Sequence, residues 1–124
     1  MIFETHAHYD DKMFDEDRES LLESMQEAGI GRIVNIGADL ASTASSIALA
    51  EKYPFIYAAA GVHPSDAAQL NEHTFQWLSE QTAHEKVVAV GEIGLDYYWE
   101  KDPEVRANQR YWFRRQLNLA REKV

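Results

Sequence analysis

The sequence predicts an α/β fold, namely the N-terminal (βα)4 half of a TIM-type (β/α)8 barrel. Strand-like and helix-like segments alternate four times along its 124 residues, as expected for parallel strands joined by right-handed helical crossovers. Polar side chains follow the first, third and fourth strand-like segments, whose carboxyl ends would share one rim of a barrel. A complete barrel needs about 250 residues, so this chain supplies roughly half of one.

An open, doubly wound sheet shows the same alternation and is the competing architecture. In the Rossmann type, a glycine-rich phosphate loop follows the first strand. Here the first strand-like segment ends in His6-Ala7-His8 instead. We therefore predict the barrel.

The first two strands are predicted at residues 1–5 and 30–37. Between them, Asp15 or Asp17 can cap a helix, because a side-chain oxygen before the first turn accepts its free N–H groups. Gly29 follows the helix in the usual C-terminal position. The apolar residues that recur at helical spacing in this segment are Leu21, Leu22, Met25 and Ala28.

The next unit has a helix that Asp39 or Ser42 opens and Pro54 stops, since proline cannot continue a helix. A third strand is predicted at residues 55–60 and a third helix at residues 71–81.

The fourth unit begins with the apolar run 87–90. Three of its four residues are valine, and such a run is typical of a strand buried on both faces. Pro103 suits the first position of a fourth helix, where its missing N–H costs nothing.

Composition limits the function classes. The formal net charge of −9 disfavours broad adhesion to nucleic acid, which depends on lysine and arginine. A nucleic acid substrate stays possible, because a metal site can supply positive charge locally. No apolar stretch is long enough for a bilayer and cysteine is absent, so we expect a cytoplasmic protein without a membrane partner or a signal peptide.

A carboxylate follows the fourth strand directly. Glu92 lies between Gly91 and Gly94, and an ionised carboxylate at the end of a buried strand needs a cation or several donors. The glycines allow a sharp turn and a close approach to the backbone. An ion pair with a neighbouring strand is the structural alternative for Glu92.

Two histidines near the N-terminus favour a bound cation over the ion pair as the partner of Glu92. Strand side chains alternate, so His6 and His8 point to the same side. Two imidazoles on one strand end and a carboxylate on another are ligands that a divalent metal prefers. The plainer alternative for the histidines is a hydrogen-bonded polar pair.

Three motifs together carry a family resemblance. Glu4-Thr5-His6-Ala7-His8, Gly61-Val62-His63-Pro64 and Gly91-Glu92-Ile93-Gly94-Leu95-Asp96-Tyr97-Tyr98 occur in this order. They resemble the motifs of the TatD family of metal-dependent deoxyribonucleases, in the amidohydrolase superfamily. The resemblance implies that residues 1–124 are the N-terminal half of one metal-dependent hydrolase barrel domain.

The resemblance also implies roles for individual residues. His6 and His8 match ligands of a first metal, Glu92 matches a carboxylate that bridges two divalent ions (Mg, Mn, Zn or Co), and His63 matches a catalytic histidine near the substrate. Two further histidines and an aspartate of the family come from strands after the fourth. Glu4 stands where the family usually has aspartate, and Ser65 where it often has histidine.

The function implied is hydrolysis of DNA phosphodiester bonds by metal-activated water in an intact barrel, and we expect residues 1–124 alone to be inactive. Hydrolysis of a cyclic amide or lactone, and a non-catalytic half-barrel assembly module, are the alternatives. His63 could instead cap a turn, and we expect Asp96 to cap its loop rather than bind metal. For Tyr97, Tyr98 and Trp99 we expect packing, with base stacking as the alternative.

A half-barrel would leave strand edges at the first and fourth strands, and such edges invite pairing. We expect the inward faces of Val34, Ile36, Val88 and Val90 to lack half of their core. We therefore expect that this chain alone does not persist as a well-folded monomer. It is either a fragment of a longer protein, which we favour, or it self-associates edge to edge into a barrel-like dimer with two-fold symmetry.

Overall fold

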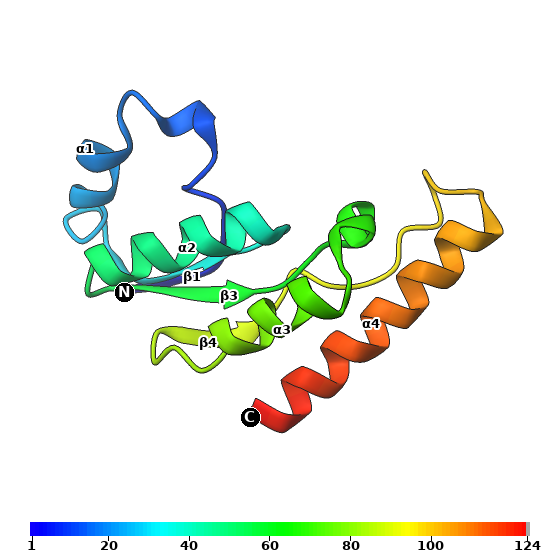
Figure 1. The fold of residues 1–124 in the computed structure, drawn as a ribbon. Coiled ribbons are helices and arrows are strands. Elements are labelled where there is room, and N and C mark those ends of the chain that lie inside the picture. The colour runs from blue at the N-terminus through cyan, green and yellow to red at the C-terminus, as the bar shows by residue number, and fades with distance from the viewer. Residues whose placement is uncertain (124) are drawn as a thin grey trace.

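The computed structural model describes residues 1–123, in which four parallel strands form one sheet (Figure 1). The sheet order is β1-β2-β3-β4, so strands that are neighbours in the chain are neighbours in the sheet. A doubly wound sheet would reverse direction at a switch point, whereas this order is that of a barrel. The predicted half-barrel is present. Its strands are β1 (Ile2–Ala7), β2 (Ile30–Ile36), β3 (Ile56–Ala60) and β4 (Val87–Val90).

Helices alternate with the strands. Two short 3-10 segments, η1 (Lys12–Phe14) and η2 (Pro64–Gln69), lie in the loops after β1 and β3. Among the described residues, no helix combines the length and apolarity needed to cross a membrane. The α-helices are α1 (Arg18–Glu23), α2 (Leu40–Lys52), α3 (Glu72–Gln81) and α4 (Pro103–Lys123).

The helix starts follow the capping pattern. Asp39 and Ser42 together form a capping box at α2, so both predicted candidates act there. Asn71 and Thr74 form a second box at α3. Pro103 is the first residue of α4, as predicted.

The first helix is shorter than predicted. It ends at Glu23, and turns rather than helix continue to Gly29, whose φ is +93°. The Gly29 carbonyl accepts from the Ile2 N–H and the Met25 carbonyl from the Ile30 N–H, so pairing with the strands diverts the chain. Asp17 occupies the cap position without a side-chain hydrogen bond.

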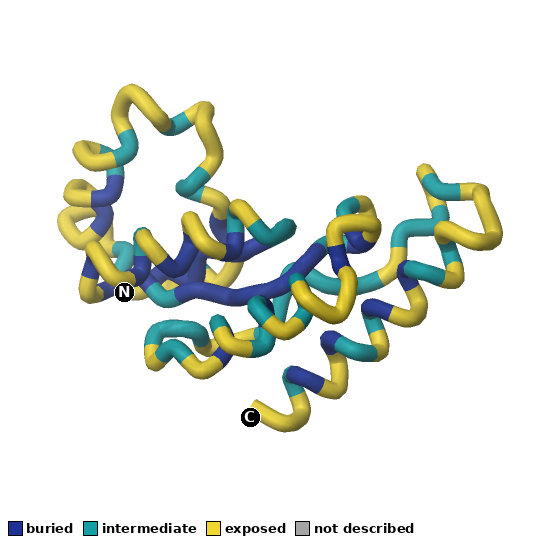
Figure 2. The backbone as a smooth tube through the Cα atoms, in the orientation of Figure 1, coloured by how far each residue is buried: buried dark blue, intermediate teal, exposed yellow. Residues whose placement is uncertain are grey.

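The core lies where α2 covers β2 and β3. Ile33, Ile56 and Leu22 are fully buried there, and Ile47 of α2 packs with them. A second cluster joins the end of β3 to α3 and α4 through Leu78 and neighbouring residues. Figure 2 shows the buried backbone along the middle of the sheet and once per turn on α4.

The fourth strand is not buried on both faces, contrary to the prediction. Val88 is 54% exposed, because β4 is the edge of the described sheet and has no further neighbour. Val34 and Ile36 are buried with Ala59, so the expected loss of core is wrong for these two residues. Side chains of adjacent strands shield one another there.

Candidate metal centre

Three predicted residues meet at the carboxyl ends of the strands. The Nε2 atoms of His6 and His8 are 3.2 Å apart. Each lies 3.9 Å from Oε2 of Glu92. One ligand atom from each of the three side chains therefore lies within 4.8 Å of the other two.

The donor set fits a divalent metal. Around one ion with bonds of about 2.0–2.1 Å, tetrahedral ligand atoms lie about 3.3 Å apart, close to the separations seen here. Two imidazole nitrogens and a carboxylate oxygen suit Zn²⁺ and related ions. All three side chains are partly exposed, so the site is open to solvent.

His8 is oriented by a backbone carbonyl. Its Nδ1 lies 3.0 Å from the oxygen of Ile36. A carbonyl can only accept, so Nδ1 carries the proton and Nε2 keeps its lone pair. Such a partner for the second ring nitrogen is typical of histidines that bind metals.

Three successive carbonyls at the end of β2 hold the predicted site residues. The Ile36 oxygen accepts from the His8 ring. The Gly37 oxygen accepts from the Glu92 N–H at 2.6 Å, and the Ala38 oxygen accepts from the His63 N–H at 2.7 Å. The segment 36–38 thus fixes residues that follow three different strands relative to one another.

Two glycines allow these strand ends to approach. A Cβ on Gly61 would lie 2.6 Å from the Gly91 carbonyl carbon. A Cβ on Gly37 would lie 2.3 Å from Oγ1 of Thr43. That hydroxyl is held in place, since it donates to the Gly61 carbonyl and accepts from the Gly61 N–H. Any larger residue at either glycine would push the site loops apart.

His63 does not join the three-residue cluster, but it follows β3 at the same rim. Its Nδ1 accepts from the Ser65 N–H at 3.1 Å and lies 2.8 Å from Ser65 Oγ. The turn-capping geometry is therefore present. Because an N–H can only donate, a neutral His63 carries its proton on Nε2.

Buried amides that the sequence reasoning did not single out fix the loops. Gln116 is 2% exposed, and its amide donates to the Val62 carbonyl and accepts from the Val62 N–H. Gln109 pairs in the same way with the backbone of Asp96. Both lie on the buried stripe of α4 with Trp112. A polar glutamine on the apolar stripe of a helix is the sequence pattern that could have indicated these two clamps.

The loop after β1 has a similar clamp. Asn35 is fully buried and accepts from the Tyr9 N–H at 2.7 Å. Its amide donates to Asp10 Oδ1 and Ser46 Oγ. The segment directly after His8 is thereby tied to β2 and α2.

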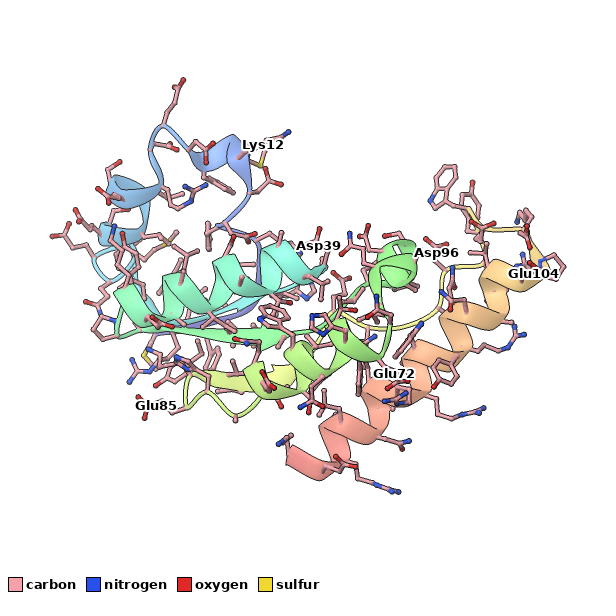
Figure 3. The ribbon with its side chains drawn as sticks, in the orientation of Figure 1. Lys12, Asp39, Glu72, Glu85, Asp96 and Glu104 are labelled. Atoms are coloured by element: carbon pink, nitrogen blue, oxygen red, sulfur yellow. The ribbon has the colours of Figure 1, made fainter. Side chains whose placement is uncertain are left out.

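Asp96, labelled in Figure 3, caps its loop as predicted. Its Oδ1 accepts from the N–H groups of Tyr98 and Trp99 at 3.2 and 3.3 Å. Tyr97 packs on Arg106, whose guanidinium lies 4.6 Å from the ring centre. Tyr98 and Trp99 do not pack into the described residues, contrary to expectation: they are 73% and 80% exposed.

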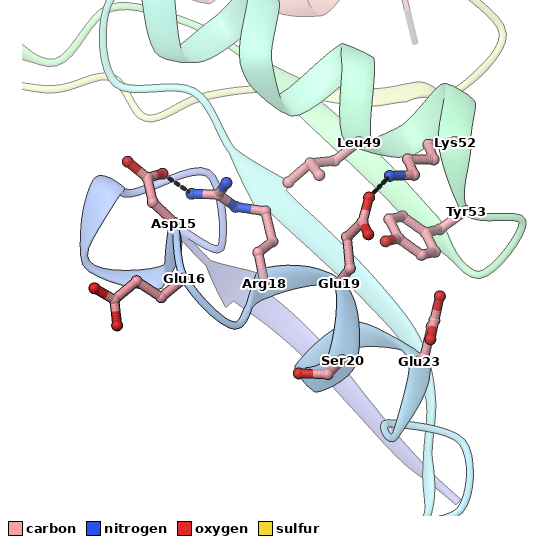
Figure 4. Close-up of a pocket in the computed structure, with 9 residues that line it drawn as sticks. All are labelled: Asp15, Glu16, Arg18, Glu19, Ser20, Glu23, Leu49, Lys52 and Tyr53. Atoms are coloured by element: carbon pink, nitrogen blue, oxygen red, sulfur yellow. Dashed lines mark hydrogen bonds and ion pairs between the residues drawn. The ribbon is translucent and has the colours of Figure 1, made fainter.

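A hollow of about 620 Å³ lies elsewhere, between α1 and the end of α2 (Figure 4). It shares no residue with the candidate metal centre. Its two cations are already paired, Arg18 with Asp15 and Lys52 with Glu19. The Lys52 hydrogen bond lowers the pKa of Glu19. We therefore place the candidate functional site at the carboxyl ends of the strands and not in this hollow.

Comparison with known proteins identifies relatives. The sequence matches the TatD related DNase family over residues 3–123. It is 43% identical to the uncharacterized metal-dependent hydrolase YabD of Bacillus subtilis, over 98% of this chain and 47% of YabD. It is 31% identical to the 3′-5′ ssDNA/RNA exonuclease TatD of Cronobacter sakazakii, over 98% of this chain and 45% of that protein. The chain spans about half the length of the curated relatives it matches.

Solved structures agree with the fold. The crystal structure of YjjV, a TatD homologue from Escherichia coli, superposes with a TM-score of 0.85 at 35% identity, over 98% of this chain and 47% of YjjV. A TatD family hydrolase from Entamoeba histolytica, at 24% identity, gives 0.80 over 98% of this chain and 46% of that protein, and supports the fold alone. The resemblance seen in the three motifs is confirmed, and the chain belongs to the TatD related DNase family.

Proposed function

We propose that the protein is a divalent-metal-dependent hydrolase that cleaves phosphodiester bonds of DNA, with a single strand as substrate. The observation that carries the proposal is the meeting of His6, His8 and Glu92 ligand atoms within 4.8 Å. Relatives named 3′-5′ ssDNA/RNA exonuclease support the choice of substrate. Residues 1–124 would then be the N-terminal half of one hydrolase barrel domain.

We assign His6 and His8 to one ion and Glu92 to both ions of a two-metal centre. A carboxylate has two oxygens and can hold two ions, whereas an imidazole offers one nitrogen to a metal. Divalent ions held there would neutralise phosphate charge and activate water for attack on phosphorus. Mixed nitrogen and oxygen ligands are compatible with Mg, Mn, Zn or Co.

His63 is the proposed catalytic residue of this half of the protein. Ser65 occupies its Nδ1, which leaves Nε2–H as the donor. That N–H can hydrogen-bond a phosphate oxygen or the negative charge that develops on the leaving oxygen. The backbone of His63 is held by the Ala38 carbonyl, and that of the preceding Val62 by the Gln116 amide. The position of the Nε2–H donor is therefore well defined.

The test is degradation of a labelled single-stranded DNA by a purified, intact barrel that contains residues 1–124, assayed with each of the four metals. Activity should require the metal and stop with a chelator, and Glu92→Gln should abolish it. An exposed carboxylate away from the site offers the matched control, Glu85→Gln, which should keep activity. A panel of lactones and cyclic amides is assayed in parallel. Hydrolysis of that panel without any action on DNA would overturn the DNA substrate, and no hydrolysis of either would overturn the enzymatic function.

A further inference from the structure

We propose that Tyr98 and Trp99 form a stacking surface for unpaired bases of the DNA strand that reaches the candidate metal centre. This inference rests on the proposed function and adds a substrate-binding site to it. It follows from the exposure of the two rings, the rigidity of their loop and their position beside the His63 loop.

The two rings are unusually exposed. Tyr98 and Trp99 are 73% and 80% accessible to solvent, and their ring centres are 4.7 Å apart at an interplanar angle of 89°. Single exposed apolar residues are common, but adjacent large aromatic side chains without cover mark an interaction surface. The rings meet edge to face, and the π-surface that this contact leaves uncovered is open to a planar ligand.

The loop that carries the rings is ordered by its own hydrogen bonds. Asp96 accepts from the N–H groups of both aromatic residues, and Gln109 clamps the Asp96 backbone. Arg106 donates to the carbonyls of Tyr97 and Glu100. Because these bonds already fix the loop, a ligand that stacks on it loses little further conformational entropy.

The position of the loop connects the rings to the site. A cavity of about 130 Å³ is lined by Trp99 and Gln109 on one side and by Pro64 and Ser65 on the other. Ser65 is the residue that holds the His63 ring. A base on Trp99 therefore lies beside the loop whose histidine is proposed to contact the phosphate.

The charge balance favours bases over phosphates as the ligand. The chain carries a net charge of −9, so general phosphate neutralisation contributes little to holding a strand. Lys101 lies 5.8 Å from the Tyr98 ring centre, but Glu100 and Asp102 flank it. Stacking on aromatic rings is tolerant of sequence, because every base has a π-face. The surface therefore suits unpaired bases of any sequence.

The experiment measures binding of a fluorescently labelled thymidine homopolymer to the purified protein in the presence of a chelator, so that no cleavage occurs. Trp99→Leu and Tyr98→Leu should each weaken binding about fivefold to a hundredfold, whereas Trp99→Phe, which keeps a ring, should bind close to the original protein. An abasic strand of equal length should bind weakly to all of them. The control is Tyr111→Leu, a half-exposed tyrosine on α4, which should leave binding unchanged.

A second readout separates stacking from phosphate contact. The part of the tryptophan emission lost in Trp99→Phe should be that of a solvent-exposed indole and should be quenched by the thymidine strand. The weakening caused by Trp99→Leu should be the same at low and high salt, because a stacked base releases no counterions. An emission typical of a buried indole in the free protein would mean that another part of the protein covers the rings and would overturn the inference.

Failure of the two proposals can be told apart. Metal-dependent DNA hydrolysis together with equal binding of abasic and thymidine strands would overturn the stacking surface alone. Base-dependent binding that the leucine variants lose, without hydrolysis under any metal, would overturn the proposed function and support the surface.

Discussion

Replacement of Gly37 by alanine should damage the metal centre through the backbone. The added Cβ would lie 2.3 Å from Thr43 Oγ1, 2.9 Å from Thr43 Cα and 3.0 Å from the Ala59 oxygen. Ordinary contacts lie at about 3.5 Å, so the closest pair must separate by roughly 1 Å. Thr43 cannot turn away without breaking both hydrogen bonds to Gly61.

The expected cost is about 1–3 kcal/mol in the free energy of unfolding, as for other overpacked sites. The same shift moves the carbonyls that hold His8 and Glu92. Loss of such supporting contacts typically weakens metal binding about 10- to 100-fold. Urea unfolding measures the first effect, and calorimetric titration with Zn²⁺ or Mn²⁺ measures the second.

The matched control is Gly31→Ala, the same change at the other end of β2. There the three heavy atoms nearest to the new Cβ all belong to the side chain of Met1, which is 92% exposed and can move aside. Stability should change by no more than about 0.5 kcal/mol, and metal affinity should not change. If Gly37→Ala bound metal as tightly as Gly31→Ala does, the segment 36–38 would not position the site.

Four further outcomes are expected. Glu92→Gln should lower metal affinity in calorimetric titration more than His63→Ala does; the reverse order would remove Glu92 from the metal centre. His63→Ala should lower turnover while metal content is kept, whereas equal losses of both would make His63 a ligand. The Arg115 hydrogen bond lowers the pKa of Glu72 below its ordinary value of 4.5, so the folded state holds this proton less tightly than the unfolded chain. Stability from this pair is present above about pH 4.5 and is lost as the pH falls through the folded pKa; Glu72→Gln should flatten that acid limb in unfolding curves, and an unchanged limb would contradict the ion pair. Residues 1–124 alone should self-associate in sedimentation analysis through exposed edges such as Val88, and a stable, cooperatively unfolding monomer would refute this.

Local patterns predicted most of the elements. The capping residues of α2, the proline at the start of α4 and the loop cap at Asp96 are confirmed, because each depends on hydrogen bonds within a few residues. The predicted length of α1 was wrong, since the backbone hydrogen bond between Ile2 and Gly29 outweighs the helical spacing of the apolar residues. The predicted burial of β4 on both faces was wrong, because the burial of a strand depends on the elements beside it as well as on its own apolar residues.

By itself, the sequence determined the alternation of strands and helices, the shared rim and the residue types of the candidate centre. Strand periodicity places His6 and His8 on one side, and parallel strands bring their carboxyl ends together with Glu92. Only the tertiary structure decided how these side chains are held. The carbonyls of residues 36–38 and the clamp of Gln116 on Val62 join segments far apart in the chain. Such contacts leave no periodic signal, because backbone groups are present at every residue and reveal their partners only after folding.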